Sequence, residues 1–319
     1  MAEPPASDAQ ADRAIDPIAL NRLLRPPAEM ASATPATPWL HGEIARRMAD
    51  RLALIRRQPA VVIDWAAAQG ASTAVLAQHC PAARIVRTDA DGHPLPATGA
   101  FAAPAAALGR WWRQWTGSAD DTNPAAMPAP APPEPRLRAD LLWANMNLHL
   151  AADQPARIAA WHAATAVDGF LMFSCLGPDT ARELHALHRE LGLGPAGARC
   201  VDLHDIGDGL VQAGFADPVM DMERLTLTWA DADAMLAELR TLGRNLAPHR
   251  HTGLRTPRWH ARWVAQLNER LRQPDGRLHL TFEVIYGHAF RVASRAKVSS
   301  QTEISLEAMR EMTRSRRAN

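Results

Sequence analysis

The chain has 319 residues, of which 47% are hydrophobic and 22% charged, and its formal net charge is +1. This length can bury one large core, or one core with an inserted cap, and the composition is typical of a globular domain. A net charge so near zero provides no overall field for binding nucleic acid or an acidic membrane, so we expect neither partner.

Cysteine usage and the lack of long apolar runs predict the compartment. Cys80, Cys175 and Cys200 are odd in number and lack metal-type spacing, so we expect reduced thiols and no bound metal. The first residues carry no apolar run behind a basic start, and no apolar stretch is long enough to span a bilayer. We therefore expect a cytoplasmic protein.

The N-terminal region combines an expected tail with the first helix. Residues 1–35 are rich in Ala, Pro and Asp, which predicts a mostly disordered tail with one helical turn around Ile18–Leu24. From Trp39 to Ile55, apolar residues recur every three or four positions, which indicates an amphipathic helix. We expect one domain over residues 36–291, followed by a polar tail over 292–319.

The next segment has the order strand, turn, helix, strand. An apolar run at Ala60–Ile63 predicts the first strand, and the helix is expected over Ser72–His79, with Ser72 as its cap. A second strand is expected at Arg84–Val86, shortly before Asp89. In open α/β sheets, a unit with this order binds nucleotide-like cofactors at the turn after its first strand.

A proline-rich stretch interrupts the chain before the next strands. Residues 123–136 cannot form a central strand, because proline lacks the backbone donor that a ladder needs. Beyond them we expect a strand at 139–148, a helix at 154–164 and a strand at 169–176. This alternation of strands and helices predicts a parallel sheet covered on both faces.

The remaining elements include a helical insertion. We expect helices from Pro178 to Gly192 and over His204–Gln212, then strands at 223–229 and 278–291. Two further helices are expected at about 231–243 and 257–273, the second with Thr256 as cap and Pro257 at its first position. Such an insertion, over about residues 230–275, would lie above the carboxyl edge of the sheet as a lid.

The turn after the first strand is a candidate cofactor loop. Asp64 is followed by Ala66, Ala68 and Gly70 at alternate positions, where a methyl-donor site of the S-adenosylmethionine type would have three glycines. An alanine forced to positive φ would cost on the order of 1 kcal/mol. Asp89 could accept hydrogen bonds from ribose hydroxyls. Two interpretations of this segment remain: a donor site with weakened affinity, and a strand–turn–helix unit that binds no ligand.

Four segments resemble one enzyme family. DLLWANMNLHL (140–150), GFLMFSCLGPDTARELH (169–185), DLHDIGDGLVQAGFADPVMDMERLTLTW (202–229) and FEVIYGHAF (282–290) closely resemble the malonyl-acyl-carrier-protein O-methyltransferases of biotin synthesis. The resemblance covers roughly residues 40–291, and its GPDT, HDIGD and VIYGHA portions are the most specific.

The resemblance implies an α/β fold with a Rossmann-like seven-strand methyltransferase sheet. That sheet is mostly parallel, with an antiparallel last strand and a helical lid inserted before it. The implied cofactor is S-adenosylmethionine, and the implied partner is an acyl-carrier protein bearing a malonyl group whose free carboxylate is methylated. A carrier of this kind is acidic, so Arg255, Arg258 and Arg262 near the lid are candidate docking residues.

The resemblance also assigns site residues. Asp64, Ala66 and Gly70 match the donor loop, Asp89 matches the ribose-binding acid, and Asn145 matches the polar residue after the fourth strand. It assigns no catalytic residue, because a carboxylate nucleophile is already ionised and needs no strong base.

Three departures from the family pattern lie at the donor site. The loop reads DWAAAQG, the segment 123–136 replaces a strand that carries an acid, and Tyr286 is the only tyrosine, so the family's N-terminal tyrosine has no counterpart. A second hypothesis is therefore a non-catalytic protein that keeps the fold, has lost cofactor binding and acts as a binding or assembly partner.

Overall fold

The computed structural model describes residues 15–24, 38–95, 137–251 and 253–293. The proline-rich stretch 123–136 and most of both predicted tails lie outside these residues. None of the described helices is both long and apolar enough to cross a membrane.

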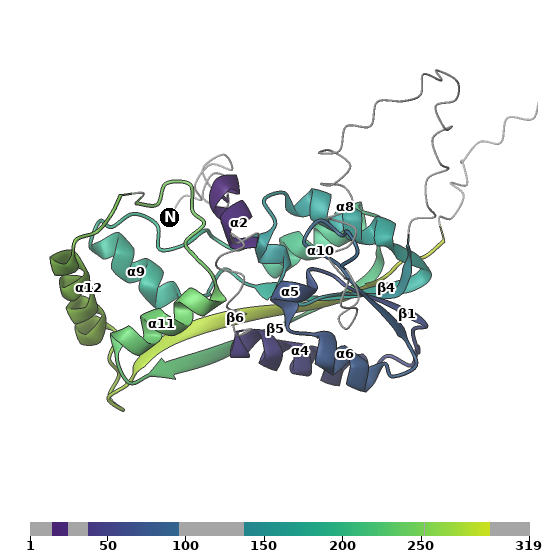
Figure 1. Ribbon diagram of the computed structural model, residues 1–319, viewed down its shortest axis with the longest axis horizontal. Coiled ribbons are helices and arrows are strands. Elements are labelled where there is room, and N and C mark those ends of the chain that lie inside the picture. Colours follow the sequence, from purple (N-terminus) through teal and green to yellow (C-terminus); the bar gives the residue numbers. More distant parts are fainter. Residues whose placement is uncertain (1–14, 25–37, 96–136, 252, 294–319) are drawn as a thin grey trace, which may run out of the picture.

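A six-stranded sheet runs through the described residues, in the order β2-β1-β3-β4-β6-β5 (Figure 1). Neighbouring strands from β2 to β4 are parallel, whereas β6 is antiparallel to both β4 and β5. The mostly parallel sheet with an antiparallel last strand is confirmed, but six strands are described where seven were expected. The strands are β1 (Val61–Asp64), β2 (Arg84–Arg87), β3 (Ala139–Ala144), β4 (Thr165–Leu176), β5 (Ala216–Trp229) and β6 (Leu278–Phe290).

Several strand ends differ from the sequence prediction. β3 ends at Ala144 because Met146 takes a left-handed conformation with φ of 51° and turns the chain away from the sheet. β5 begins at Ala216 and pairs with β6 along nearly its whole length. The strand can hold Pro218 because it lies at the edge of the sheet, and the register shifts between Ala216 and Val219.

Helices cover both faces of the sheet (Figure 1). One face packs against α4 (Trp39–Leu52) and α6 (Thr73–His79), whose buried apolar residues share a core with strand residues such as Trp143. The other face packs against α8 (Gln154–Ala164) and α10 (Leu203–Gln212) in a second core. The predicted periodicity of α4 is confirmed by its buried stripe Leu40, Ile44, Met48 and Leu52.

The helical insertion predicted before the last strand is confirmed. α11 (Ala232–Leu242) and α12 (Pro257–Arg270) connect β5 to β6 and lie with α9 (Arg182–Glu190) at one end of the molecule (Figure 1). Thr256 caps α12 as predicted, since its hydroxyl accepts the amide hydrogen of Trp259 at 3.2 Å. Trp263 and Leu267 on the inner side of α12 are buried in the first core.

α9 (Arg182–Glu190) begins at Arg182 rather than at Pro178. The residues before it form a turn that is bonded to β6. The amide of Asp179 donates to the Glu283 carboxylate at 2.7 Å, and the amide of Ala181 donates to the Thr281 carbonyl at 2.7 Å. A loop between Leu176 and α9 is therefore held against the last strand.

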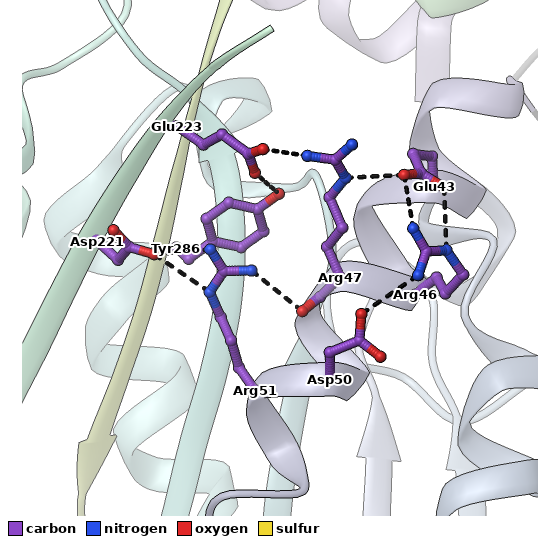
Figure 2. Close-up of polar contacts among 8 residues, drawn as sticks. All are labelled: Glu43, Arg46, Arg47, Asp50, Arg51, Asp221, Glu223 and Tyr286. Atoms are coloured by element: carbon purple, nitrogen blue, oxygen red, sulfur yellow. Dashed lines mark hydrogen bonds and ion pairs between the residues drawn. The ribbon is translucent and has the colours of Figure 1, made fainter.

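Charged side chains join α4 to the antiparallel part of the sheet (Figure 2). Arg47 bonds to Glu223, and Arg51 bonds to Asp221 at 2.7 Å while its guanidinium lies 3.9 Å from the centre of the Tyr286 ring. Each partly exposed pair contributes little alone, but together they fix the position of α4 relative to β5 and β6. The N-terminal end of α4 reaches the candidate site.

Candidate functional site

The loop after β1 crosses the carboxyl end of the sheet and contains the short helix α5 (Ala67–Gly70). Ala66 is left-handed, with φ of 54°, and Ala71 is left-handed with φ of 53°. Ala68 lies within α5 and does not have positive φ. Of the two alanines at expected glycine positions, only Ala66 therefore carries backbone strain, on the order of 1 kcal/mol.

The methyl groups of these two alanines occupy different surroundings. Ala66 is fully buried and belongs to the core that contains Leu148 and Trp161. Ala68 lines a cavity of about 560 Å³, which we call the smaller cavity. Only the Ala68 side chain therefore takes up space where a ligand could lie.

Ser72 was expected to cap α6, and this expectation is wrong. Its hydroxyl makes no capping bond. Instead it donates to the Gly70 carbonyl at 3.0 Å and accepts the indole hydrogen of Trp143 at 2.8 Å. A side chain this deeply buried bonds to the nearest polar groups, so Ser72 ties the loop to β3.

Asn145 and His41 hold the same loop from two sides. The Asn145 amide donates to the carbonyls of Gly70 at 2.5 Å and His41 at 2.8 Å, and its oxygen accepts from Ser174 at 2.7 Å. The His41 Nδ1 donates to the Gln69 carbonyl at 2.6 Å, and burial lowers the pKa of His41, which keeps the ring neutral. Both residues act as buried supports.

Asp64 is a fully buried carboxylate with one unsatisfied oxygen. Its Oδ2 accepts from the Thr73 hydroxyl at 3.2 Å, while its Oδ1 has no partner among the described residues. Burial raises the pKa of Asp64 to about 6, although Thr73 and Arg87 act in the opposite direction. A cationic group placed against the free oxygen would satisfy it and restore the charge.

Asp89 follows β2 and lines the smaller cavity. Its Oδ1 accepts the amide hydrogens of Asp91 and His93, both at 2.9 Å, and its side chain is 37% exposed. Partial desolvation alone would raise the pKa of Asp89, but these hydrogen bonds outweigh it and lower the pKa. The carboxylate is thus ionised, its Oδ2 lies 3.3 Å from His93 Nδ1, and its exposed part can reach a hydroxyl-bearing ligand. The side chains of Asp89, Asp91 and His93 place ligand atoms within 4.8 Å of one another, but no second feature among the described residues indicates a metal.

The smaller cavity is of a size typical for small-molecule sites. Of the five residues predicted for the donor site, Asp89 lines it directly, and Asp64, Ala66, Gly70 and Asn145 form the buried support behind its loop. Asp64 is fully buried and does not line the cavity, and the Asp89 carboxylate is the group that the ribose hydroxyls of a nucleoside cofactor require. The site residues therefore fit such a cofactor.

Sequence reasoning missed an aromatic wall of the smaller cavity. Trp65 donates from its indole to the Ala90 carbonyl at 3.2 Å, and the Arg157 guanidinium lies 5.7 Å from its ring centre. Gly92 leaves room for this ring, because a Cβ at its φ of 88° would lie 2.5 Å from the indole. No local pattern marks these residues, since Trp65 and Arg157 meet only in the folded chain.

Helix α2 (Pro17–Leu24) covers the smaller cavity from the N-terminal side. The Asp16 amide donates to the Leu246 carbonyl at 2.8 Å, and the Asp16 carboxylate pairs with Arg250 at 2.6 Å. Leu20 lines the smaller cavity, whereas Leu23 lines a second cavity. The helix predicted near residue 18, α2, thus separates the smaller cavity from a second cavity.

That second cavity, which we call the larger cavity, has a volume of about 1200 Å³. It lies between α9, α11, the segment 243–249 and the loop after β4. Among the described residues that line it, Asp179 is the only acidic one, and the exposed arginines at its rim are Arg182, Arg189, Arg199, Arg240 and Arg244. This excess of positive charge favours an anionic ligand.

The two cavities approach each other at the short helix η1 (Leu148–Leu150). Leu150 lines the larger cavity and the next residue, Ala151, lines the smaller one. Together with α2, this segment places a nucleoside-type site and an anion-type site next to each other. Such an arrangement allows a group to pass from one ligand to another.

Comparison with known proteins gives a consistent result. No family model matches the chain. The chain is 36% identical over 263 residues to a malonyl-[acyl-carrier protein] O-methyltransferase of Gallionella capsiferriformans, an alignment that covers 82% of this chain and 87% of that relative. A protein of the same name from Laribacter hongkongensis is 36% identical over 265 residues, covering 81% and 84%, respectively. One from Halorhodospira halophila is 32% identical over 270 residues, covering 84% and 87%.

Proposed function

Because the chain belongs to the malonyl-[acyl-carrier protein] O-methyltransferase family, we propose that it methylates the free carboxylate of malonyl-acyl-carrier protein in biotin synthesis, with S-adenosylmethionine as donor. The observation that carries this proposal is the junction at η1, where a cavity with an open carboxylate meets a cavity rimmed by arginines. S-adenosylmethionine, when bound, supplies a methyl group on a sulfonium centre.

On the donor side, the chain contributes recognition and loop support. The Asp89 carboxylate would accept hydrogen bonds from the ribose hydroxyls, whereas Asp64 is fully buried and does not line the cavity, so it supports the loop from behind. Ala66, Gly70 and Asn145 hold the loop in place through the core packing and carbonyl bonds described above. The buried methyl group of Ala66 supports this proposal, because it does not enter the cavity.

On the acceptor side, the protein needs alignment and exclusion of water more than acid–base chemistry. The malonyl carboxylate is ionised at neutral pH, so no residue has to remove a proton. Its oxygen forms the new bond to the methyl carbon as the carbon–sulfur bond breaks, and the bonding electron pair stays on sulfur. The larger cavity can enclose the thioester arm and hold its charged end near η1.

The arginine rim of the larger cavity is the proposed docking surface for the acidic carrier protein. Arg189, Arg240 and Arg244 line this cavity, whereas Arg258 and Arg262 on α12 do not. Reversing the charge with Arg240→Glu is expected to raise KM for the malonyl carrier about tenfold and leave KM for malonyl-pantetheine unchanged. Arg258→Glu serves as the matched control. An equal effect of both variants would show that the rim is not the specific docking surface.

Two measurements test the proposed function itself. Titration calorimetry with S-adenosylhomocysteine is expected to show binding, which Asp89→Asn weakens. The gene is also expected to restore growth of a biotin-requiring strain that lacks its own malonyl-carrier methyltransferase. Failure of both, with folded protein present in the cells, would contradict the proposal and favour a non-catalytic binding role.

A further inference from the structure

His149 lies at the junction of the two cavities. It belongs to η1, between core residues Leu148 and Leu150, and it is a partly exposed residue that lines the larger cavity. The residue after Leu150 already lines the smaller cavity. The imidazole therefore stands at the end of the larger cavity that is nearest to the donor side.

The protonation state of the ring is set by one hydrogen bond. The amide of Leu176 donates to His149 Nδ1 at 3.3 Å, so Nδ1 carries no proton and Nε2 does. Burial lowers the pKa of His149 to about 3, with nearby His41 adding to the effect. The ring is consequently neutral at physiological pH, and no hydrogen-bond partner of Nε2 is found within the described part of the chain.

The amide that fixes this ring is itself held firmly. The residue after Leu176 is Gly177, whose amide donates to the Glu283 carbonyl at 2.8 Å. A Cβ at Gly177 would lie 2.8 Å from the Glu283 side chain, so the loop packs directly on β6. The Glu283 carboxylate also accepts from the Asp179 amide. His149 is therefore positioned by a rigid part of the fold.

We propose that His149 binds the acceptor: its Nε2–H donates a hydrogen bond to the carboxylate oxygen that is not methylated. This inference rests on the proposed function and assigns it a specificity-determining residue. A neutral donor suits this position because the carboxylate loses its negative charge as the ester forms. A cation in contact with it would stabilise the bound acceptor more than the transition state and would slow transfer. The rim arginines bind the carrier protein, and His149 orients the carboxylate.

Two conservative variants separate this role from a structural one. In His149→Asn, the side-chain oxygen can still accept from the Leu176 amide, but no donor remains at the ε position. In His149→Gln, an amide NH₂ remains near the ε position and the bond to Leu176 is lost. Both are compared with the unchanged protein for KM and kcat with malonyl-pantetheine, for S-adenosylhomocysteine affinity and for melting temperature.

If His149 has the proposed role, His149→Asn is expected to raise KM for malonyl-pantetheine about tenfold or more, because a hydrogen bond to a charged group is lost. His149→Gln is expected to stay within a few-fold of the unchanged protein, and S-adenosylhomocysteine affinity is expected to be the same in all three. A near-normal Asn variant with an impaired Gln variant would overturn the inference and indicate a purely structural bond to Leu176.

A readout on the unchanged protein covers the case in which a variant does not fold. With ¹⁵N-labelled histidine and saturating S-adenosylhomocysteine, the Nε2–H signal of His149 is expected to shift when malonyl-pantetheine is added. Acetyl-pantetheine, which lacks the carboxylate, is expected to leave it in place. An unmoved signal with malonyl-pantetheine bound would overturn the role of His149 alone. Absence of any malonyl-pantetheine binding would overturn the proposed function as well.

Discussion

Replacing Asp64 with Asn is expected to stabilise the protein at neutral pH and to leave donor binding close to that of the unchanged protein. Asp64 is fully buried, and its pKa is raised from 3.8 to about 6. A difference of about 2 pH units corresponds to about 3 kcal/mol between the two protonation states. Because the folded pKa is the higher one, the carboxyl group's favourable contribution is complete below pH ~4 and is lost as the pH rises through ~6.

The assay is urea unfolding of both proteins at pH 4.5, 6 and 7.5. Asp64→Asn removes the ionisation, so its free energy of unfolding is expected to exceed that of the unchanged protein by up to ~3 kcal/mol at pH 7.5. The difference should shrink towards acid pH. Asp208→Asn, on an exposed position of α10, controls for the loss of a negative charge. Parallel stability curves over this pH range would refute the reasoning about Asp64.

Donor binding tests the second half of the same argument. Because Asp64 is fully buried and does not line the smaller cavity, binding of S-adenosylhomocysteine near pH 6 is expected to leave its protonation unchanged. Calorimetry in buffers of different ionisation enthalpy measures any proton release, and Asp64→Asn is expected to show the same release and an affinity within a few-fold of the unchanged protein. A proton release that Asp64→Asn abolishes would instead show that the ligand's ammonium group reaches the free oxygen of Asp64.

Further predictions concern the loop and α2. Ala66→Gly relieves about 1 kcal/mol of backbone strain and is expected to leave the affinity for S-adenosylhomocysteine unchanged. Ala68→Gly opens the smaller cavity and is expected to change that affinity. Titration calorimetry compares the two variants. Arg250→Ala removes the partner of Asp16 and is expected to weaken S-adenosylhomocysteine binding through α2, and an unchanged affinity would show that α2 is not needed. Ser72→Ala leaves the Trp143 indole unsatisfied and should destabilise the fold by about 1–3 kcal/mol in urea unfolding.

The layered fold could be predicted because apolar periodicity is a local property. The sequence predicts residues 154–164 as a helix, and α8 has those bounds. The end of β3 could not be predicted in this way, since Met146 and Leu148 remain apolar and buried after the strand has turned away. The start of α9 was misplaced for a different reason. Its expected first turn bonds to β6, which is about 100 residues away in the chain.

From spacing alone, the candidate site could be predicted only where its residues are close in sequence, whereas Asn145 was identified through the family resemblance. Asp64, Gly70 and Asp89 belong to one strand–turn–helix–strand unit, so their spacing carried a signal. His41 and His149 contribute through backbone contacts made by distant segments, and no spacing rule marks them. The backbone strain at Ala66 could be identified only from the structure, because the sequence does not determine which of the two alanines adopts a left-handed conformation.

The account depends most on whether a methyl group reaches the malonyl carboxylate. Mass spectrometry of malonyl-acyl-carrier protein, incubated with this protein and S-adenosylmethionine, measures that directly. We predict a gain of one methyl group as a base-labile ester, and no gain with the acetyl-carrier protein. An unmodified malonyl carrier, from a preparation that binds S-adenosylhomocysteine, would contradict the account.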